Sequence, residues 1–553
     1  MVKRLWRTIR EILSLRQTSI ISAAFVIMVT VFTSRILGLV RDRMLAARFS
    51  PDELGIYFAA FRIPNLVFEL LVMGAVSAAF IPVFTDYLNE KEKDQVWKLA
   101  SSVINIGFLF FAILSIPIFI FSLPICRFIA PGFTPSQLSQ MVFFTRIMLL
   151  AQVFPLIIGN FLTGILQSFK HFLIPSLAPV VYNLGIILGI FFLTPFFGLY
   201  GPVFGVVLGA ILFMVIQIPL VRSLGFRHFW QLGFSDPGVR DVGRLMLPRT
   251  FGLAVSQIDT TVDLILSTLL GARMVTIFSF AQHLQQLPIG LFGATIAQAA
   301  LPTLSEVKAK KNLKDFKNTF LASMHQILFL VLPVSAIMLV LRIPVVRLVF
   351  GASRFDWEAT VLTGKTLAFF SISLFAQSLI HLLARGFYAL HDSKTPVVVG
   401  IIAVILNAVL SIYFIQSLGL PVWGLAISTS IASIINAGLL LIFLDQKVGK
   451  FERGRLILPA VKIFFASFIT GVFLYIPMKL LDQLVFDTTR TINLIALTGV
   501  ATSAGLSVYL FLAWFLKIEE IVTFLNLAKK IRRAPLRLIE TSQEVVNGGG
   551  GEI

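Results

Sequence analysis

Long apolar runs recur along nearly the whole chain, from Ile20 to Leu516, and short polar segments separate them. Most of these runs reach the roughly twenty residues that an α-helix needs to cross a bilayer. A transmembrane β-barrel would instead alternate polar and apolar positions in segments of about ten residues, and the chain lacks this pattern. We therefore predict an all-α polytopic membrane protein with about 14 transmembrane helices. The predicted spans are residues 20–46, 56–85, 99–123, 139–166, 173–195, 199–221, 245–270, 275–303, 318–341, 358–384, 396–416, 421–444, 456–479 and 491–516.

The two halves of the chain also resemble each other. The matching segments are 164–175 and 386–396, before the fifth and eleventh spans, 197–206 and 417–426, after them, and 78–82 and 299–302, at the ends of the second and eighth. Spans 1–6 and 7–12 are therefore predicted to form two six-helix lobes in a parallel repeat, followed by two C-terminal helices. Duplicated bundles with a site between them are typical of alternating-access transporters. The predicted segments are 1–19, a basic interfacial helix; 20–222, the N-lobe; 223–244, a cytoplasmic linker; 245–445, the C-lobe; 446–518, the last two helices; and 519–553, a basic cytoplasmic tail.

The chain carries a formal net charge of +19, although only 13% of its residues are charged. If the N-terminus is cytoplasmic, the cytoplasmic segments hold roughly thirty Lys and Arg residues and the outer loops roughly eight. This imbalance explains the positive charge without a nucleic-acid partner and predicts that both termini are cytoplasmic. Residues 3–16 combine an apolar face with several arginines, as expected of a helix that binds anionic membrane lipids.

Motifs for covalent chemistry are missing from the sequence. Its single cysteine, Cys126, excludes an internal disulfide, a Cys-based zinc site and an iron–sulfur cluster. There is no G-x-x-x-x-G-K-[ST] loop for ATP and no H-E-x-x-H helix for zinc. No small-residue cleavage pattern follows the basic N-terminus, so no cleavable signal peptide is expected. We predict that the protein is not an enzyme.

Charged residues inside an apolar span are costly, and their default interpretation is functional. Arg35 lies fifteen residues after Ile20, hence about 22 Å along the helix and inside the hydrocarbon core. Arg41 lies about 31 Å along, near the boundary, where an arginine can also extend to the interface. Seven-residue spacing places Arg35 with Asp42, and Ser34 with Arg41, on common faces of a helix. Asp42 is expected to hold one of the arginines by a charge-assisted bond.

Other polar residues within the spans extend this set. Arg62, Arg249 and His283 are candidates for the wall of a cationic cavity. A cationic cavity in an apolar protein indicates an anionic substrate, because arginine forks match phosphate oxygens in pairs. Asp263, Asn407 and Thr429 have two interpretations: an oxygen cage for a monovalent cation such as sodium, or a hydrogen-bonded cluster between helices.

Several segments resemble the MurJ/MviN family, the lipid II flippases of the multidrug/oligosaccharidyl-lipid/polysaccharide exporter superfamily. The segments are S-R-I-L-G-L-V-R-D (34–42), F-R-I-P-N-L (61–66), G-A-V-S-A-A-F-I-P-V-F (74–84), A-P-G-F (130–133), V-S-Q-I-D (255–259), L-P-I-G-L-F-G (287–293) and G-F-Y-A-L-H-D-S-K-T-P (386–396). The resemblance covers about residues 18–518. It implies fourteen helices and the transfer of an undecaprenyl-pyrophosphate-linked peptidoglycan precursor, lipid II, to the outer leaflet of the bacterial cytoplasmic membrane. It also places Ser34, Arg35, Arg41 and Asp42 on the family's first-helix signature, and implies that the arginines of this signature face a central cavity.

The resemblance is incomplete at polar positions. Gly55 and Met73 stand where family members usually have acidic residues, Phe68 and His283 stand at arginine positions, and Ser411 stands at an acidic cation-ligand position. Three hypotheses therefore remain: a flippase for lipid II, an exporter of another lipid-linked saccharide or a cation-coupled small-molecule exporter of the same superfamily, and a non-transporting membrane scaffold for cell-wall synthesis. The first predicts a monomer that binds a lipid-linked oligosaccharide pyrophosphate and has cell-wall synthesis proteins as partners.

Overall fold

A computed structural model describes residues 20–70, 79–310, 312–484 and 490–522; for residues 20–26, 247–256 and 484 it describes the backbone alone. The predicted interfacial helix at 1–19, the tail beyond Val522 and the position Met73 lie outside the described residues. No strand occurs among the residues that the structure describes, so the all-α prediction is confirmed.

The first half of the chain forms helices of very different lengths. They are α2 (Ile20–Arg48), α3 (Pro51–Ala60), α4 (Arg62–Phe68), α5 (Ile81–Glu90), α6 (Lys93–Ile120), α7 (Ser122–Ile129), α8 (Pro135–Ile147), the π-helical η3 (Met148–Gln152), α9 (Val153–Ser168), α10 (Leu173–Leu188), η4 (Gly189–Leu193), α11 (Thr194–Phe197), α12 (Tyr200–Val215) and α13 (Ile218–Ser223).

Longer helices dominate the second half. They are α14 (Pro237–Leu269), α15 (Ala272–Pro288), η5 (Ile289–Ala294), α16 (Thr295–Ala309), α17 (Leu313–Val340), α18 (Arg342–Phe350), α19 (Trp357–Ala389), α20 (Lys394–Ile412), η6 (Tyr413–Ser417), α21 (Trp423–Lys447), α22 (Arg453–Leu484) and α23 (Thr491–Phe515).

Among the described residues, 11 helical stretches are long and apolar enough to cross a membrane, and they coincide with predicted spans 3–6 and 8–14. The first and seventh predicted spans coincide with α2 and α14, helices of 29 and 33 residues. The second predicted span is broken in the structure, because α3 ends at Ala60 and α4 begins at Arg62. The count of fourteen therefore stays a prediction. The predicted linker 223–244 is shorter in the structure, since α14 already begins at Pro237.

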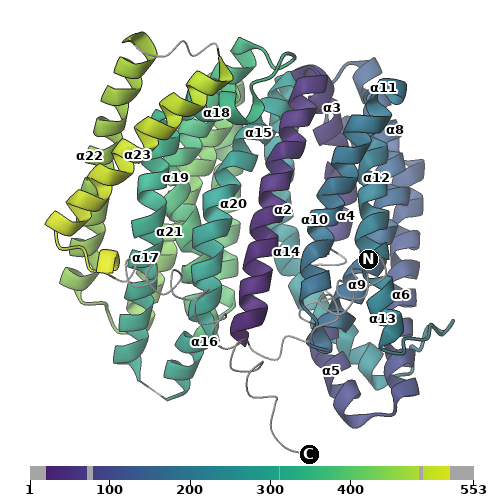
Figure 1. Ribbon diagram of the computed structural model, residues 1–553. Coiled ribbons are helices and arrows are strands. Elements are labelled where there is room, and N and C mark those ends of the chain that lie inside the picture. The colour runs from purple at the N-terminus through teal and green to yellow at the C-terminus, as the bar shows by residue number, and fades with distance from the viewer. Residues whose placement is uncertain (1–19, 71–78, 311, 485–489, 523–553) are drawn as a thin grey trace, which may run out of the picture. The chain divides into compact units, whose positions relative to one another are not determined.

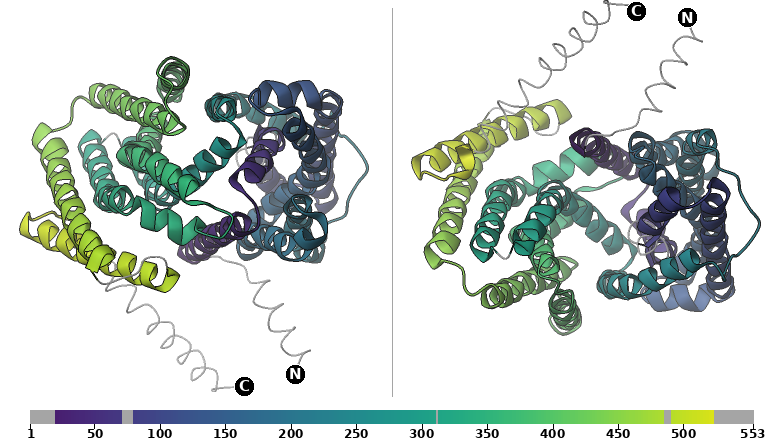
Figure 2. Two further views of the ribbon diagram at one scale, coloured as in Figure 1. Left: turned by 90° about the horizontal axis from the view of Figure 1, so that it is seen from above. Right: turned by 90° about the horizontal axis from the view of Figure 1, so that it is seen from below.

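The chain forms two compact units that do not follow the order of the sequence. Unit 1 comprises residues 1–287, 345–370 and 397–435, and unit 2 comprises 288–344, 371–396 and 436–553. The division into two lobes of consecutive spans stays a prediction. In unit 1, α10 packs between α2 and α12 (Figure 1). In unit 2, α22 packs against α17 and crosses α23 (Figure 1). Many helices within each unit are seen nearly end-on in Figure 2.

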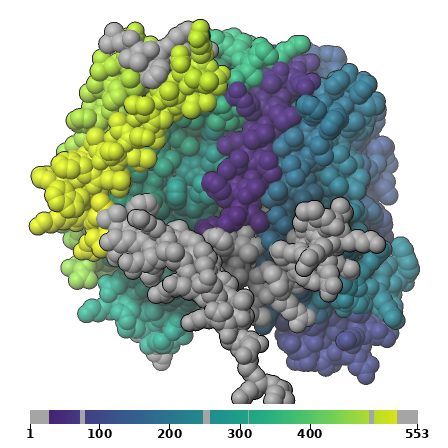
Figure 3. Space-filling model, in the orientation of Figure 1, coloured from purple at the N-terminus to yellow at the C-terminus, as the bar shows by residue number. Residues whose placement is uncertain are grey.

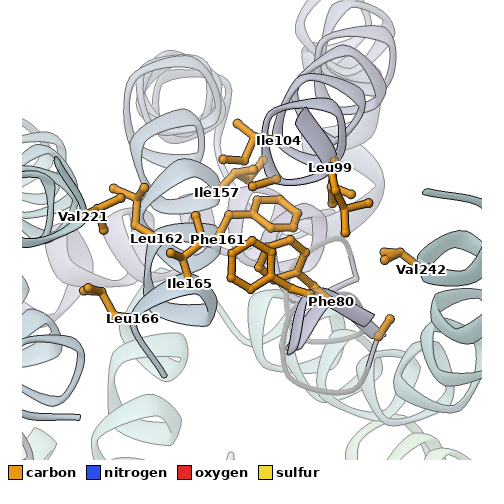
Figure 4. Packing of buried hydrophobic residues seen from close by; sticks show 14 of the residues in the cluster. Phe80, Leu99, Ile104, Ile157, Phe161, Leu162, Ile165, Leu166, Val221 and Val242 are labelled. Carbon is orange, nitrogen blue, oxygen red and sulfur yellow. The ribbon is translucent and has the colours of Figure 1, made fainter. Parts of the chain in front are cut away.

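A large apolar core lies inside unit 1, where α5, α6 and α9 meet. Phe80 contacts Phe161 edge to face, with ring centroids 5.6 Å apart, and stacks on Phe84 at 5.1 Å. Ile104, Ile157 and Leu166 extend this core along α6 and α9 (Figure 4).

The lipid-facing character of the first helix is visible on the surface of unit 1. In Figure 3, α2 forms a continuous band, and its exposed side chains include Met28, Val29, Phe32, Ile36 and Val40. Exposed apolar side chains on a membrane helix contact lipid tails at no cost, so they need no protein partner.

Candidate functional site

A polar cavity of about 360 Å³ lies within unit 1. Its walls come from α2, α3, α4, α10, α14 and α15. The lining residues are Arg41, Tyr57, Phe58, Phe61, Arg62, Asn65, Tyr182, Thr260, Leu264, Phe278, Ser279, Gln282 and His283. Its volume lies at the lower end of the roughly 300–1,000 Å³ that is usual for ligand pockets.

The chain turns between α2 and α3, and Arg41 of α2 and Tyr57 of α3 line the same cavity. Ser50 caps α3: its hydroxyl accepts from the Glu53 backbone N–H, while the Glu53 carboxylate accepts from the Ser50 backbone N–H. Pro51 at the first helical position fits this start, because its missing N–H would have no helical acceptor. The capping box thus fixes the entry of the chain into α3.

Pro64 explains the break between α3 and α4. A proline has no N–H to donate to the carbonyl four residues earlier, which here belongs to Ala60. That carbonyl instead accepts from the Thr145 hydroxyl of α8, at 3.2 Å. Arg62 therefore lies at the break, and its side chain is 8% exposed.

A continuous polar chain connects α2, α10 and α15. The Arg41 Nε donates to Asp42 Oδ1 at 2.9 Å, and its Nη1 donates to Asn183 Oδ1 at 3.2 Å. The Asn183 amide donates in turn to the hydroxyl and the carbonyl oxygen of Ser34. The other Asp42 oxygen lies 2.8 Å from His283 Nδ1. As predicted, Asp42 binds an arginine, and four of the predicted site residues are linked through Asn183.

Arg62 forms a second polar connection, to α14. Its Nε and Nη2 donate to Thr261 Oγ1 at 2.9 and 2.7 Å, and Nη2 also donates to the Gln257 carbonyl. The Gln257 side-chain amide donates to Glu69. Both cavity arginines are thus bonded to acceptors of the protein itself.

Other predicted residues are placed differently. Arg35 is exposed and does not line this cavity, while the side chain of Arg249 lies outside the described residues. The neighbouring Arg43 contacts α18, where its Nη1 donates to the Leu348 carbonyl at 2.5 Å. Phe68 packs against the apolar core, so the arginine position of the family has no polar role here.

The acidic cluster joins α14, α20 and α21. The Asn407 amide donates to Asp259 Oδ1 at 2.8 Å and to Asp263 Oδ1 at 3.2 Å. Ser411 donates to Asn407 Oδ1, and the hydroxyls of Thr429 and Ser411 face the Asp263 carboxyl. Asp263 is 3% exposed.

One end of unit 1 is closed by unusually tight packing. A Cβ at Gly55 would overlap the Ala272 carbonyl oxygen, and a Cβ at Gly132 would overlap that of Thr268. The Thr276 hydroxyl donates to the Pro51 carbonyl at 2.5 Å. The ends of α14 and α15 therefore contact the start of α3 and the loop before α8 directly.

An ionic cluster covers the same end. Arg273 Nη2 lies 2.6 Å from Asp356 Oδ1 and 3.3 Å from Glu358 Oε2, and its Nη1 lies 3.9 Å from Asp52 Oδ2. Asp356 lies in the loop before α19. Partial burial raises the pKa of Asp356, but the bonds from Arg273 and from the Ala359 backbone N–H outweigh it and hold this pKa below its usual value.

The sequence did not reveal Asn183, Tyr57, Tyr182 or Thr261 as site residues. Asn183 is the one with a usable signal, since it is an isolated amide within the apolar run V-V-Y-N-L-G-I-I-L. The two tyrosines and the threonine are ordinary in membrane helices. Only the packing of α3, α10 and α14 places the tyrosines at the cavity and Thr261 beside Arg62.

The fold and the cavity define a class: a multi-pass helical membrane protein with an arginine-containing polar chamber among its spans. The description "Lipid II flippase MurJ" belongs to the family model that matches residues 52–494. The chain belongs to this family of lipid II flippases.

Relatives extend over nearly the whole chain. The probable lipid II flippase MurJ of Bdellovibrio bacteriovorus is 28% identical over 508 residues, which cover 91% of this chain and 96% of that protein. The lipid II flippase MurJ of Burkholderia cenocepacia is 27% identical over 429 residues, or 75% of this chain and 81% of that protein.

Solved structures agree on the fold. A lipid II flippase MurJ in an inward closed conformation matches with a TM-score of 0.74 at 24% identity, covering 89% of this chain and 99% of that one. An inward-facing multidrug resistance transporter of the MATE family matches with a TM-score of 0.64 at 15% identity, covering 75% and 94%.

Proposed function

We propose that the protein moves lipid II from the inner to the outer leaflet of the bacterial cytoplasmic membrane. The observation that carries this proposal is the pair of arginines, Arg41 and Arg62, in the wall of one cavity among membrane helices. Two guanidinium groups suit a pyrophosphate, because each fork can bind two phosphate oxygens. The protein forms and breaks no covalent bond, and only the position of the substrate changes.

Binding of the pyrophosphate requires an exchange of partners at both arginines. Arg41 must release Asp42 or Asn183, and Arg62 must release Thr261 or the Gln257 carbonyl. These partners come from α10 and α14 as well as from α2 itself. Substrate binding therefore weakens bonds between helices, which couples the occupied cavity to a change of conformation.

The orientation of the chain assigns the closed end to the outside. We place both termini in the cytoplasm, because the positive charges concentrate on that side of the predicted topology. The ends of α14 and α15 at Gly55 and Gly132 then face the outer surface. In this state the cavity is shut toward the outside, as alternating access requires of one of its two states.

Cation coupling follows from the acidic cluster. The carboxylates of Asp259 and Asp263 share the amide of Asn407. Because burying their negative charge is costly, a monovalent cation or a proton must balance it. The oxygens of Asp259, Asp263, Asn407, Ser411 and Thr429 fit a small hard cation. When bound, such an ion would supply the opposite charge, while Asn407 holds the two carboxylates together.

Complementation tests the main proposal. We would deplete the native flippase of a bacterium that needs it, express this chain, and measure lipid II exposed on the outer leaflet. Arg41→Ala is expected to abolish rescue, because it removes one phosphate ligand and leaves the buried Asp42 with His283 alone. Arg48→Ala is the matched control, since Arg48 lies on the same helix and is exposed.

The outcomes distinguish the three hypotheses. Rescue by the wild-type chain and by Arg48→Ala, but not by Arg41→Ala, supports the flippase. Membrane-inserted wild-type protein that fails to expose lipid II would refute the proposal and favour a scaffold or an exporter of another compound. Arg35→Ala is a third arm, which tests whether an exposed arginine outside this cavity also contributes.

A further inference from the structure

A second cavity in unit 1 has a different chemistry. It measures about 310 Å³ and lies where α6, α9 and the first turns of α14 meet. Every residue in its wall is apolar or glycine, including Ile106, Phe110, Phe161, Val242 and Gly243. Figure 4 shows Val242 on a helix separate from the one that carries Phe161. The cavity shares no residue with the polar one.

The second cavity lies at membrane depth. Its wall on α6 belongs to a helix that is long and apolar enough to span the bilayer. Phe110, which lines the cavity, is 48% exposed and continues a strip of exposed apolar side chains with Phe108 and Ile113. Such a strip contacts lipid tails, and an apolar hollow beside it attracts hydrocarbon rather than water.

Positive charge lies beside the cavity on α14. Arg240 and Arg244 are both exposed, and each follows directly after a residue of the cavity wall, Val239 or Gly243. Arg240 Nε donates to the Phe234 carbonyl, which leaves its two terminal nitrogens free for another acceptor. On α6, Lys98 is also exposed and precedes Val103 of the cavity wall. On α14, the exposed Asp241 lies between the two arginines and carries the opposite charge.

The loop before α14 marks the level of the lipid headgroups. Asn105 of α6 fixes this loop by donating to the carbonyls of Phe229 and Gln231. Trp230 between them is 92% exposed, as is typical of tryptophans at the membrane–water interface. Trp230 thus lies in the loop before α14, and the two arginines lie next in sequence to residues of a hollow whose wall is wholly apolar.

We propose that this hollow, formed by α6, α9 and the start of α14, binds one hydrocarbon chain of an anionic glycerophospholipid, whose phosphate lies at Arg240 and Arg244. In the orientation proposed above, this lipid belongs to the cytoplasmic leaflet. The chain fills space that the side chains leave empty, and the headgroup is held by charge. The bound lipid therefore fastens the first turns of α14 to α6 and α9.

Gly243 allows a direct test. A Cβ at this position would meet no heavy atom within 4 Å, so a larger side chain can enter the hollow without strain. We would purify the full-length protein and measure retained phosphatidylglycerol by native mass spectrometry, together with the shift in Tm when this lipid is added. Gly243→Phe is expected to abolish both signals, and Gly243→Ala, the matched control, to keep them.

The headgroup is tested separately. The wild type is expected to prefer phosphatidylglycerol to phosphatidylcholine by on the order of tenfold, from two cationic side chains near the surface. Arg240→Gln combined with Arg244→Gln is expected to remove this preference but to keep chain binding. Equal binding of the two lipids by the wild type would overturn the assignment of the phosphate.

A photoreactive phosphatidylglycerol with a diazirine in one acyl chain avoids dependence on any variant. Labelled peptides from 103–110 or 239–246 would support the site, and labelling confined to other segments would overturn it. Undecaprenyl phosphate and excess phosphatidylglycerol are then tested as competitors of the probe. If only undecaprenyl phosphate displaces the probe, the hollow binds a prenyl chain and the proposal is refuted. None of these measurements depends on lipid II transport, so they stand apart from the flippase test.

Discussion

At the scale of single residues, the side chain of Asn183 decides how Arg41 is held. It accepts from the guanidinium with its oxygen and donates to Ser34 and to the Pro179 carbonyl with its nitrogen. One amide therefore fixes the arginine relative to both α2 and α10. No other neutral side chain among the described residues has such a position in the polar chain.

We expect Asn183→Ala to reduce lipid II transport several-fold and to destabilise the fold by about 1–3 kcal/mol, because a buried donor loses its acceptor. Asn160→Ala is the control, since the Asn160 amide bonds only to the Leu156 carbonyl of its own helix. Transport assays and thermal melts of both variants test this. Equal effects of the two changes would contradict the positioning role of Asn183.

Gly55 permits close contact between α3 and α15 because it has no side chain. Its α-carbon lies so close to the Ala272 carbonyl that no side chain fits between α3 and α15. The acidic residue that the family resemblance leads one to expect at this position would prevent the closure seen here. Loss of that carboxylate in this chain is thus linked to a tight contact between helices.

We expect Gly55→Asp to lower the population of the conformation in which this end of unit 1 is closed. Spin labels at Ser139 and Ser353, both exposed, on a Cys126→Ser background would report longer distances in this variant. Gly499→Ala is the control, because a Cβ at this position on α23 meets nothing within 4 Å. An unchanged distance distribution in Gly55→Asp would show that the contact does not hold the end closed.

At the scale of helices and loops, the Arg273 cluster joins the beginning of α15 to the first turn of α3 and to the start of α19. Its carboxylates are largely solvent-exposed, with side-chain exposures of 50–73%. Exposed ion pairs contribute only about 0–1 kcal/mol each. The cluster therefore adjusts the balance between states, whereas the glycine contacts determine whether closure is sterically allowed.

The lowered pKa of Asp356 sets the pH at which this cluster weakens. A carboxyl group whose folded-state pKa is depressed stabilises the closed end above its unfolded value, near 3.9, and this contribution is lost as the pH falls through the folded value. We expect constant distances between the same spin labels from about pH 5 to 8 and opening only below about pH 4. Arg273→Ala should abolish this acid transition. A transition near neutral pH would indicate a different titrating group.

Helices α14, α20 and α21 jointly make the acidic cluster, and its occupant is measurable. We expect sodium to raise the Tm of the wild type, because a ligand that binds only the folded state stabilises it by about 2.7 kcal/mol at a hundredfold excess over Kd. Asp263→Asn should lose this effect. Asp241→Asn, an exposed position on the same helix, should keep it. Equal stabilisation by sodium and potassium in all three proteins would indicate a general salt effect.

At the scale of the whole molecule, the topology follows from the distribution of charge. We expect a cysteine at Ser353 on a Cys126→Ser background to react with a membrane-impermeant maleimide in spheroplasts. A cysteine at Lys310 should react only after the membrane is disrupted. Both positions are exposed and lie in or beside loops. The reverse pattern would invert the proposed direction of transport.

The sequence by itself determined that this is a multi-pass helical membrane protein, and it located the 11 helical stretches in the described part of the chain that are long and apolar enough to cross the bilayer. This was possible because each polar residue in the hydrocarbon core costs free energy by itself, so a membrane span can be identified from its local composition. The sequence also singled out Arg41, Asp42, Asp263 and Asn407 as candidates, because a polar residue inside an apolar run is costly without a partner. The structure gives each of them a polar partner. The sequence also predicted that Asp42 holds an arginine, and the partner is Arg41, its neighbour in sequence, rather than Arg35 on the common helix face.

Only the tertiary structure decided which partner each of these groups has. Depth along the helix favoured Arg35 over Arg41 as a functional residue, yet the packing of α2 against α10 leaves Arg35 exposed and turns Arg41 toward Asn183. Contacts such as that of Arg62 with Thr261 join residues separated by 199 positions. Depth in the membrane depends on position along one helix, whereas the choice of partner depends on how several helices rotate and pack. That information is shared among distant parts of the chain, so no local pattern contains it.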